Sequence, residues 1–387
     1  MIIEPKIRGF ICTTAHPTGC ATNVQRQIDH VTVKGPIESK QQRVLVLGCS
    51  TGYGLASRIV TTFGHGADTV GVSFERPPAE GKTASAGWYN NRAFEQRAIA
   101  AGRKAVTVEG DAFSDAVKAE TIEAIKAELG QVDLLVYSLA SPVRTDPATG
   151  TTYRSAIKPL NNTVHAKTLN TGTGEVSMVD IEPASEDEAA STVKVMGGED
   201  WELWINALSA AGVLAEGFQT LNYTYLGSEL TWPIYHKGTL GTAKADLDRA
   251  AKALRGQYGE QSAFVVALKA VVTQASSAIP MVPLYGTLML KVMGEMGINE
   301  GCIEQIDRLF RVKLPELVLD EQSRVRVDDW ELSEPVQAEL TRRWPLLTTE
   351  TLGELADLEA YRKEFLKLFG FGLSGVDYAA DVDPREV

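Results

Sequence analysis

The chain has 387 residues, of which 44% are hydrophobic and 23% are charged, a composition that excludes a disordered, collagen-like or disulfide-scaffold protein. Its 38 basic residues are outnumbered by 50 acidic ones, and the formal net charge of −12 argues against a nucleic-acid partner, because such binding depends on neutralising phosphates. Two local acidic clusters, 186–188 and 328–331, are interpreted as solvated surface that favours solubility.

Cysteine usage and the lack of long apolar stretches indicate the compartment. The four cysteines are scattered and form no C-x-x-C pair, which favours reduced thiols. Residues 1–20 lack the apolar core of a signal peptide, and no uninterrupted apolar run is long enough to span a bilayer. We therefore expect a cytoplasmic protein with no membrane partner. The five histidines show no ligand spacing, so no metal is expected.

The first half of the chain predicts alternating strands and helices after a mixed N-terminal segment. Residues 1–42 predict short strands or turns with one helix near 23–30. The next strands are predicted at 43–47, 69–74, 105–109 and 132–138, and the helices at 52–63, 89–101 and 114–129. Strands alternating with helices of this length indicate βαβ units, and hence an α/β, Rossmann-like, doubly wound parallel sheet.

The alternation stops at residues 141–184, where Pro, Gly, Thr and Asn predict an inserted loop with one or two hairpins. Ser185 and Glu188 then fit a capping box that begins a long helix, interrupted or restarted at 197–198. In that helix Trp201 and Trp204 are expected on one face.

The second half predicts the end of the sheet and a helical cap. A fifth strand at 218–223, a helix at 239–255 and a sixth strand at 263–268 are followed by mostly helical sequence. We predict one large domain made of an N-terminal extension (1–42), a dinucleotide-binding core with the insertion (43–280) and a helical C-terminal cap (281–387).

A glycine-rich segment lies between the first core strand and the first core helix. Gly48, Gly52 and Gly54 follow a G-x-x-x-G-x-G spacing. Residues without a side chain allow a tight turn and a close approach of the backbone to pyrophosphate, whose charge the helix N-terminus favours. The segment predicts a dinucleotide site, with a plain structural turn as the alternative.

The ends of the next three strands carry groups suited to the rest of such a cofactor. Glu75 can accept hydrogen bonds from the adenosine ribose and would repel a 2′-phosphate, which favours NADH over NADPH, although Arg76 offsets part of that repulsion. Asp111 is expected near the adenine, and residues 138–140 near the nicotinamide ribose.

A tyrosine and a lysine are the candidate catalytic pair. Of the eleven tyrosines, none has a lysine four or seven residues further on, whereas Tyr235 has Lys244 nine residues on. The pair follows the fifth strand and enters a helix, where an ammonium can stabilise a phenolate and hold the cofactor ribose. The alternatives are a carbonyl reductase of 3-oxoacyl thioesters or other ketones, against which the absence of a lysine four residues after any tyrosine argues, and a dinucleotide sensor without catalysis, against which the intact pair argues.

Long strings of sequence then resemble a known family. They comprise residues 8–12, 15–20, 45–58, 87–91, 110–115, 137–146 and 194–201. The chain resembles the FabV-type trans-2-enoyl reductases, which include trans-2-enoyl-CoA reductases. The resemblance implies an NADH-dependent, monomeric enzyme that reduces the trans-2 double bond of enoyl-CoA or enoyl-acyl carrier protein in fatty acid elongation.

The resemblance also assigns roles to individual residues. It implies that Tyr235 is the proton donor, that Lys244 binds the cofactor and that Tyr225 contacts the substrate thioester. The residues implied to bind NAD are Gly48, Cys49, Ser50, Thr51, Gly52, Tyr53, Phe74, Glu75, Asp111, Ala112, Leu139 and Ala140, with Val271, Val272 and Thr273 closing over it. The apolar segment 278–293 is a candidate wall for the acyl chain, with core packing as the alternative.

Overall fold

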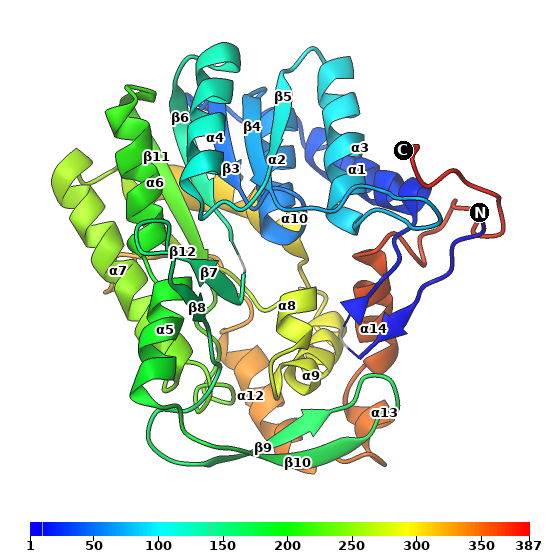
Figure 1. The fold of residues 1–387 in the computed structure, drawn as a ribbon. Helices are drawn as coiled ribbons and strands as arrows, with labels where there is room; N and C mark the ends of the chain where they lie inside the picture. The colour runs from blue at the N-terminus through cyan, green and yellow to red at the C-terminus, as the bar shows by residue number, and fades with distance from the viewer. Residues whose placement is uncertain (10, 140) are drawn as a thin grey trace.

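A parallel sheet forms the centre of the computed structural model, which describes residues 1–9, 11–139 and 141–387. Its strands are β3 (Arg43–Leu47), β4 (Asp68–Ser73), β5 (Ala105–Glu109), β6 (Val132–Tyr137), β11 (Leu214–Thr224), β12 (Ala263–Ala267) and β13 (Val325–Arg326). They lie in the order β13-β12-β11-β6-β3-β4-β5, and every pair is parallel (Figure 1). The strand order reverses between β3 and β6, where open α/β sheets bind ligands at the carboxyl ends of their strands.

Helices cover both faces of this sheet, as the alternation of buried residues along the strands requires. Val44 and Val46 of β3 face one helical layer, whereas Leu45 and Leu47 face the other. The first layer comprises α1 (Pro17–Thr32), α2 (Gly52–Phe63), α3 (Ala86–Ala100) and α10 (Cys302–Arg308), and the second α4 (Asp115–Glu128), α6 (Glu199–Ala210) and α7 (Thr239–Tyr258). The predicted doubly wound fold is therefore confirmed.

The second layer contains both tryptophans that were predicted to share a helix face. Trp201 and Trp204 on α6 are fully buried. Each indole also satisfies its N–H, since Trp201 Nε1 donates to Thr220 Oγ1 (2.8 Å) and Trp204 Nε1 donates to the Ala112 carbonyl (3.0 Å). These bonds join α6 to β11 and to the end of β5, and so fix one side of the carboxyl edge of the sheet.

The insertion after β6 forms two antiparallel hairpins. They are β7 (Val143–Thr145) with β8 (Thr152–Arg154) and β9 (Val164–Leu169) with β10 (Val176–Ile181). The following helix α5 (Glu186–Met196) begins with the predicted capping box, in which Ser185 Oγ accepts from Glu188 N (3.1 Å) and Glu188 Oε2 accepts from Ser185 N (2.9 Å).

The C-terminal part is mostly helical, as predicted, and it includes one strand that the sequence did not indicate. Its elements are α8 (Gln274–Ser277), α9 (Val282–Glu295), η1 (Leu309–Lys313), α11 (Leu314–Glu316), α12 (Glu334–Arg343), η2 (Trp344–Leu346), α13 (Leu352–Leu355) and α14 (Leu358–Lys367). The unpredicted strand is β13, which pairs Val325 with Val266 and Arg326 with Ala267. Two residues are too short a run to produce a periodic pattern.

The two chain ends meet beside α14 (Figure 1). The N-terminal segment forms a small hairpin of β1 (Ile7–Arg8) and β2 (Ile11–Cys12). The Met1 amino group donates to the Val382 carbonyl (2.6 Å), so the extension is tied to the C-terminal tail. Among the helices of the described residues, none combines the length and apolar character needed to cross a membrane.

Candidate active site

The glycine loop follows β3 and has the tight geometry that its spacing predicts. A Cβ on Gly54 would lie 1.9 Å from the Gly48 carbonyl oxygen, and one on Gly48 would lie 2.3 Å from the Ser138 carbonyl oxygen. Gly48 (φ +79°) and Gly52 (φ +55°) also have left-handed backbone. The N-cap Thr51 makes no side-chain cap bond at the start of α2. The loop therefore has the close backbone approach and the helix N-terminus that a pyrophosphate requires.

Within this loop the three side chains of Cys49, Ser50 and Tyr53 point to different partners. The Cys49 thiol is fully buried, lies 3.7 Å from Arg58 Nη1, and its pKa is raised to about 11 by burial. Ser50 Oγ donates to Glu75 Oε1 (2.6 Å). The Tyr53 hydroxyl donates to the Lys269 carbonyl (2.7 Å), so it links α2 to the end of β12. Cys49 therefore offers a cofactor only its backbone.

Two carboxylates, rather than one, lie at the ends of β4 and β5. Glu75 was predicted from the sequence, but Glu109 was not, because its place at the end of a strand carries no distinctive spacing. Glu109 Oε2 accepts from Ser73 Oγ (2.8 Å) and from the Glu75 N–H (3.2 Å). Burial raises the pKa of Glu109, and the charge of Glu75 raises it further. Phe74, which precedes Glu75, is 81% exposed.

The predicted cofactor residues that follow β5 and β6 also lie at the carboxyl edge of the sheet. Asp111 follows β5, and its Oδ1 accepts from Phe113 N (3.0 Å), while Ala112 is buried. Leu139 follows β6 and packs against the second helical layer. Ala140 lies outside the described residues.

The segment after β12 approaches the same edge from the opposite side. Val271, Val272 and Thr273 are half-buried. Thr273 is the N-cap of α8, and its Oγ1 accepts from Ser276 N (3.0 Å). This cap holds the predicted closing segment in place with hydrogen bonds that do not involve a ligand.

Tyr225, Tyr235 and Lys244 meet at one cavity. They line a space of about 70 Å³ together with Leu226, His236, Gly241, Ala245 and Arg324. Tyr225 directly follows β11, and its ring meets the Tyr235 ring edge-on, with centroids 5.0 Å apart and planes at 82°. The structure thus brings the predicted pair and the predicted substrate contact together.

The backbone around Tyr235 explains why the pair is held together. The Tyr235 carbonyl accepts from Gly241 N (2.9 Å), which fixes the tyrosine to the first turn of α7, the helix that carries Lys244. A Cβ on Gly241 would lie 1.9 Å from the His236 carbonyl oxygen, so this contact requires glycine.

The protonation of the pair suits a donor and a nearby cation. Burial raises the pKa of Tyr235, and the charge of Glu331 raises it further, so the phenol keeps its proton at neutral pH. Burial lowers the pKa of Lys244 to about 8, against the attraction of Asp248. Neither the Tyr235 hydroxyl nor the Lys244 ammonium is hydrogen-bonded to another described residue.

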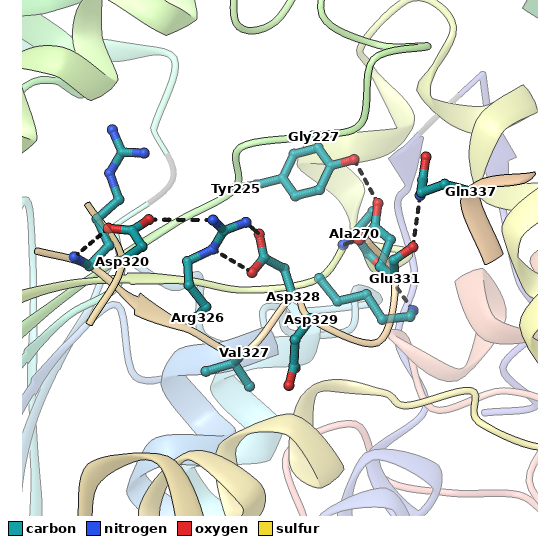
Figure 2. Close-up of polar contacts among 12 residues, drawn as sticks. Tyr225, Gly227, Ala270, Asp320, Arg326, Val327, Asp328, Asp329, Glu331 and Gln337 are labelled. Carbon is teal, nitrogen blue, oxygen red and sulfur yellow. Dashed lines mark hydrogen bonds and ion pairs between the residues drawn. The ribbon is translucent and has the colours of Figure 1, made fainter. Parts of the chain in front are cut away.

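The second acidic cluster is not the solvated surface that its composition indicates. Asp328 is 1% exposed and Glu331 is fully buried. Glu331 Oε1 accepts a hydrogen bond from the Tyr225 hydroxyl (3.0 Å), which places this carboxylate next to the cavity (Figure 2). That interpretation is therefore wrong for these two residues. For Glu331, the contact lies with a residue 106 positions away in sequence, which composition does not reveal.

Three family models match consecutive parts of the chain. Residues 2–80 match the NAD(P)H binding domain of trans-2-enoyl-CoA reductase, and residues 82–314 match the trans-2-enoyl-CoA reductase catalytic region. Residues 319–382 match a model described as an enoyl reductase FAD binding domain.

Residues 319–382 do not fit an FAD group. Their described part consists of helices α12 to α14, η2 and the short β13, and so lacks the strand, glycine loop and helix unit that holds a dinucleotide. Val336, Leu340 and Leu352 instead pack into a core with α9. A Cβ on Gly370 would lie 2.5 Å from Cys20 N, so this glycine serves packing against α1. No step of the chemistry below involves FAD.

Curated relatives match over nearly the whole chain. The Aeromonas salmonicida enoyl-[acyl-carrier-protein] reductase [NADH] FabV is 56% identical, and the match covers 99% of this chain and 98% of that protein. The Euglena gracilis trans-2-enoyl-CoA reductase is 54% identical over 99% of this chain and 71% of that protein.

Solved structures agree with this relationship. Treponema denticola trans-2-enoyl-CoA reductase in complex with NAD is 47% identical with a TM-score of 0.95, covering 100% of this chain and 99% of that chain. The Clostridium acetobutulicum trans-2-enoyl-CoA reductase in complex with NADH is 40% identical with a TM-score of 0.96, covering 100% and 98%. The chain therefore belongs to the trans-2-enoyl-CoA reductase family, to which the FabV-type enoyl-acyl carrier protein reductases also belong.

Proposed function

We propose that this protein uses NADH to reduce the trans-2 double bond of enoyl thioesters to the saturated acyl thioester, the last reductive step of fatty acid elongation. The observation that carries the proposal is the cavity where Tyr225, Tyr235 and Lys244 meet, since Tyr225 follows β11 at the same carboxyl edge of the sheet from which the glycine loop extends after β3. Full-length relatives named as NADH-dependent enoyl reductases support the same reaction.

The side chains of the cavity supply the proton donor for this reaction and a cation near it. When bound, the reduced nicotinamide supplies a hydride for Cβ of the enoyl thioester. Negative charge then collects on the thioester oxygen, and the Tyr235 hydroxyl donates a hydrogen bond to it before the proton reaches Cα. One such preorganised donor is typically worth about 3 kcal/mol of barrier. Lys244 keeps a positive charge near the phenol and the cofactor ribose.

The carboxylates at the ends of β4 and β5 explain the choice of NADH. We expect Glu75 to accept hydrogen bonds from the ribose hydroxyls, and the carboxylate of Glu109 lies close enough for the two charges to interact. A 2′-phosphate would have to approach both charges. Arg76 is exposed, and among the described residues its guanidinium forms no ion pair with either carboxylate.

The acyl chain requires more room than the cavity offers. About 70 Å³ holds only a few water molecules, which occupy roughly 30 Å³ each in the liquid. Helix α9 belongs to the buried cluster against which Tyr225 packs. We infer that α9 and the segment before it form the wall that moves to admit the chain, a gating step common in such enzymes.

Loss of NADH absorbance with crotonyl-CoA tests the proposed function. We expect oxidation of NADH only when the enoyl thioester is present, with butyryl-CoA as the product. Turnover of acetoacetyl-CoA but not crotonyl-CoA would overturn the proposal in favour of a carbonyl reductase. Absence of turnover with every thioester would favour a dinucleotide sensor.

The acyl carrier, the oligomeric state and the location complete the proposal. Relatives are named for both carriers, so we propose that enoyl-CoA and enoyl-acyl carrier protein are both substrates. Crotonyl-CoA and crotonyl-acyl carrier protein, compared at equal concentration, test this. We also propose a monomeric, cytoplasmic enzyme, which sedimentation of the purified protein and fractionation of the cells test.

A further inference from the structure

Glu331 is a fully buried carboxylate of the C-terminal segment that is hydrogen-bonded to Tyr225, a residue that lines the cavity. It follows β13, and Figure 2 shows it beside Tyr225 and Ala270. Its Oε1 accepts from the hydroxyls of Tyr225 (3.0 Å) and Tyr285 (2.7 Å), and its Oε2 accepts from the Ala270 N–H (2.7 Å). These donors come from the end of β11, from α9 and from the segment after β12.

The charge of this carboxylate is compensated inside the protein. Burial raises the pKa of Glu331, whereas the Lys269 ammonium and the three hydrogen-bond donors lower it. Lys269 is itself 2% exposed, and its Nζ donates to the Ala270 carbonyl (2.9 Å). Burying a carboxylate has a large desolvation cost unless the group is hydrogen-bonded and paired with a cation. The three hydrogen bonds and the Lys269 ammonium therefore offset the cost of burying the Glu331 charge.

The hydrogen bond with Glu331 decides what the Tyr225 hydroxyl can do. A phenol has one proton, and here that proton is directed at Glu331. Tyr225 then presents only lone pairs to the cavity, so it can accept a hydrogen bond but cannot also donate one to the thioester oxygen. The Tyr235 hydroxyl has no such partner and is the free donor of the pair.

The same bond also fixes the Tyr225 ring. That ring is the face against which the Tyr235 ring packs edge-on, with centroids 5.0 Å apart. We propose that Glu331 is a positioning residue for the enoyl reduction: its carboxylate holds Tyr225, and Tyr225 in turn holds Tyr235 in the orientation in which it donates its proton. The inference rests on the proposed function, because it concerns the proton donor of that reaction.

Asp328 provides a matched control on the same segment. It is 1% exposed, like Glu331, but both of its oxygens accept from one guanidinium, that of Arg326 (2.8 Å each), as Figure 2 shows. Replacing either carboxylate by its amide disturbs a buried charge. Only the replacement of Glu331 also disturbs a tyrosine of the cavity.

The experiment compares Glu331→Gln with Asp328→Asn, and repeats Glu331→Gln in a Tyr225→Phe background. We expect Glu331→Gln to lower kcat with crotonyl-CoA about tenfold, the size typical of a hydrogen bond to a charged group, with the Kd for NADH unchanged. Asp328→Asn is expected to keep wild-type kcat. In the Tyr225→Phe background, Glu331→Gln is expected to cost less than about twofold more, because both changes remove the same contact.

Three results would overturn the proposal while the wild-type enzyme turns over crotonyl-CoA: an unchanged kcat in Glu331→Gln, an equal loss in Asp328→Asn, or a full loss that persists in the Tyr225→Phe background. Circular dichroism checks that each variant folds. If Glu331→Gln does not fold, Glu331→Asp replaces it, since a side chain shorter by one methylene withdraws its oxygens from Tyr225 and should lower kcat equally. Lack of wild-type turnover would instead refute the proposed function itself.

Discussion

The cofactor side and the substrate side of the cavity are built by contacts of different range. On the cofactor side, Ser50 reaches Glu75 across 25 residues of sequence, and both lie at the ends of neighbouring strands. On the substrate side, Tyr225 is held by Glu331 across 106 residues. The contact between Ser50 and Glu75 thus lies within one βαβ unit, whereas the contact that holds Tyr225 depends on the C-terminal segment.

The largest effect is expected at the proton donor of the substrate side. Tyr235→Phe removes the only hydroxyl of the tyrosine pair that is free to donate, so kcat should fall about 10²-fold or more. The Kd for NADH, measured by its fluorescence, should stay at the wild-type value, because the glycine loop is untouched. A variant that keeps wild-type kcat would show that another group protonates the substrate.

We expect Lys244 to lie near both the Tyr235 phenol and the cofactor ribose, so its titration should appear in the pH dependence of kcat/KM. Its pKa is lowered to about 8, so the ammonium loses its proton as the pH rises through that value, and kcat/KM should fall there. Lys244→Arg keeps its charge to higher pH and should lose this downturn, even with lower overall activity. The same downturn in the arginine variant would assign the titration to a different group.

The proposed roles of Glu75 and Glu109 can be tested through the preference of the enzyme for NADH over NADPH. Glu75→Gln should reduce the preference for NADH over NADPH about tenfold, because it removes one of two charges facing a 2′-phosphate. Glu109→Gln should reduce it less, since Glu75 remains. The measurement is the ratio of kcat/KM for the two cofactors. An unchanged ratio in both variants would mean that these carboxylates do not face the ribose.

The smallest effect is expected outside both sides, at the start of α5. Ser185→Ala removes one half of the capping box and should lower the free energy of unfolding by about 1 kcal/mol. The kcat should not change, since α5 contributes no residue to the cavity. Ser185→Thr keeps an oxygen at the cap and is the control. A loss of kcat in Ser185→Ala would couple the insertion to the cavity.

Features set by short-range chemistry were predictable from the sequence. The glycine loop was predictable because a Cβ on Gly54 would clash with the Gly48 carbonyl oxygen within the same turn. The capping box was predictable because Ser185 and Glu188 satisfy each other's backbone N–H groups. Features that depend on pairing between distant parts of the chain were not predictable from the sequence. The strand β13 has two residues and forms only because β12 provides its partner.

The polarity of a residue in sequence also does not reveal its burial. Asp328 and Glu331 read as surface charge, and only their contacts with Arg326 and Tyr225 show them to be interior groups. Conversely, Cys49 lies in the predicted loop, yet its thiol points into the core beside Arg58. The roles of Tyr225 and of residues 271–273 came from the family resemblance, since an aromatic residue at a strand end has no distinctive local pattern.

Isotope labelling of the product separates the hydrogen that the cofactor side supplies from the hydrogen that the substrate side supplies. Crotonyl-CoA is reduced once with NADH deuterated at C4 of the nicotinamide in ordinary water, and once with ordinary NADH in deuterium oxide. We expect deuterium at Cβ of butyryl-CoA from the cofactor and at Cα from the solvent, through the Tyr235 hydroxyl. Cofactor deuterium at Cα, or at a carbon that bears oxygen, would contradict this expectation.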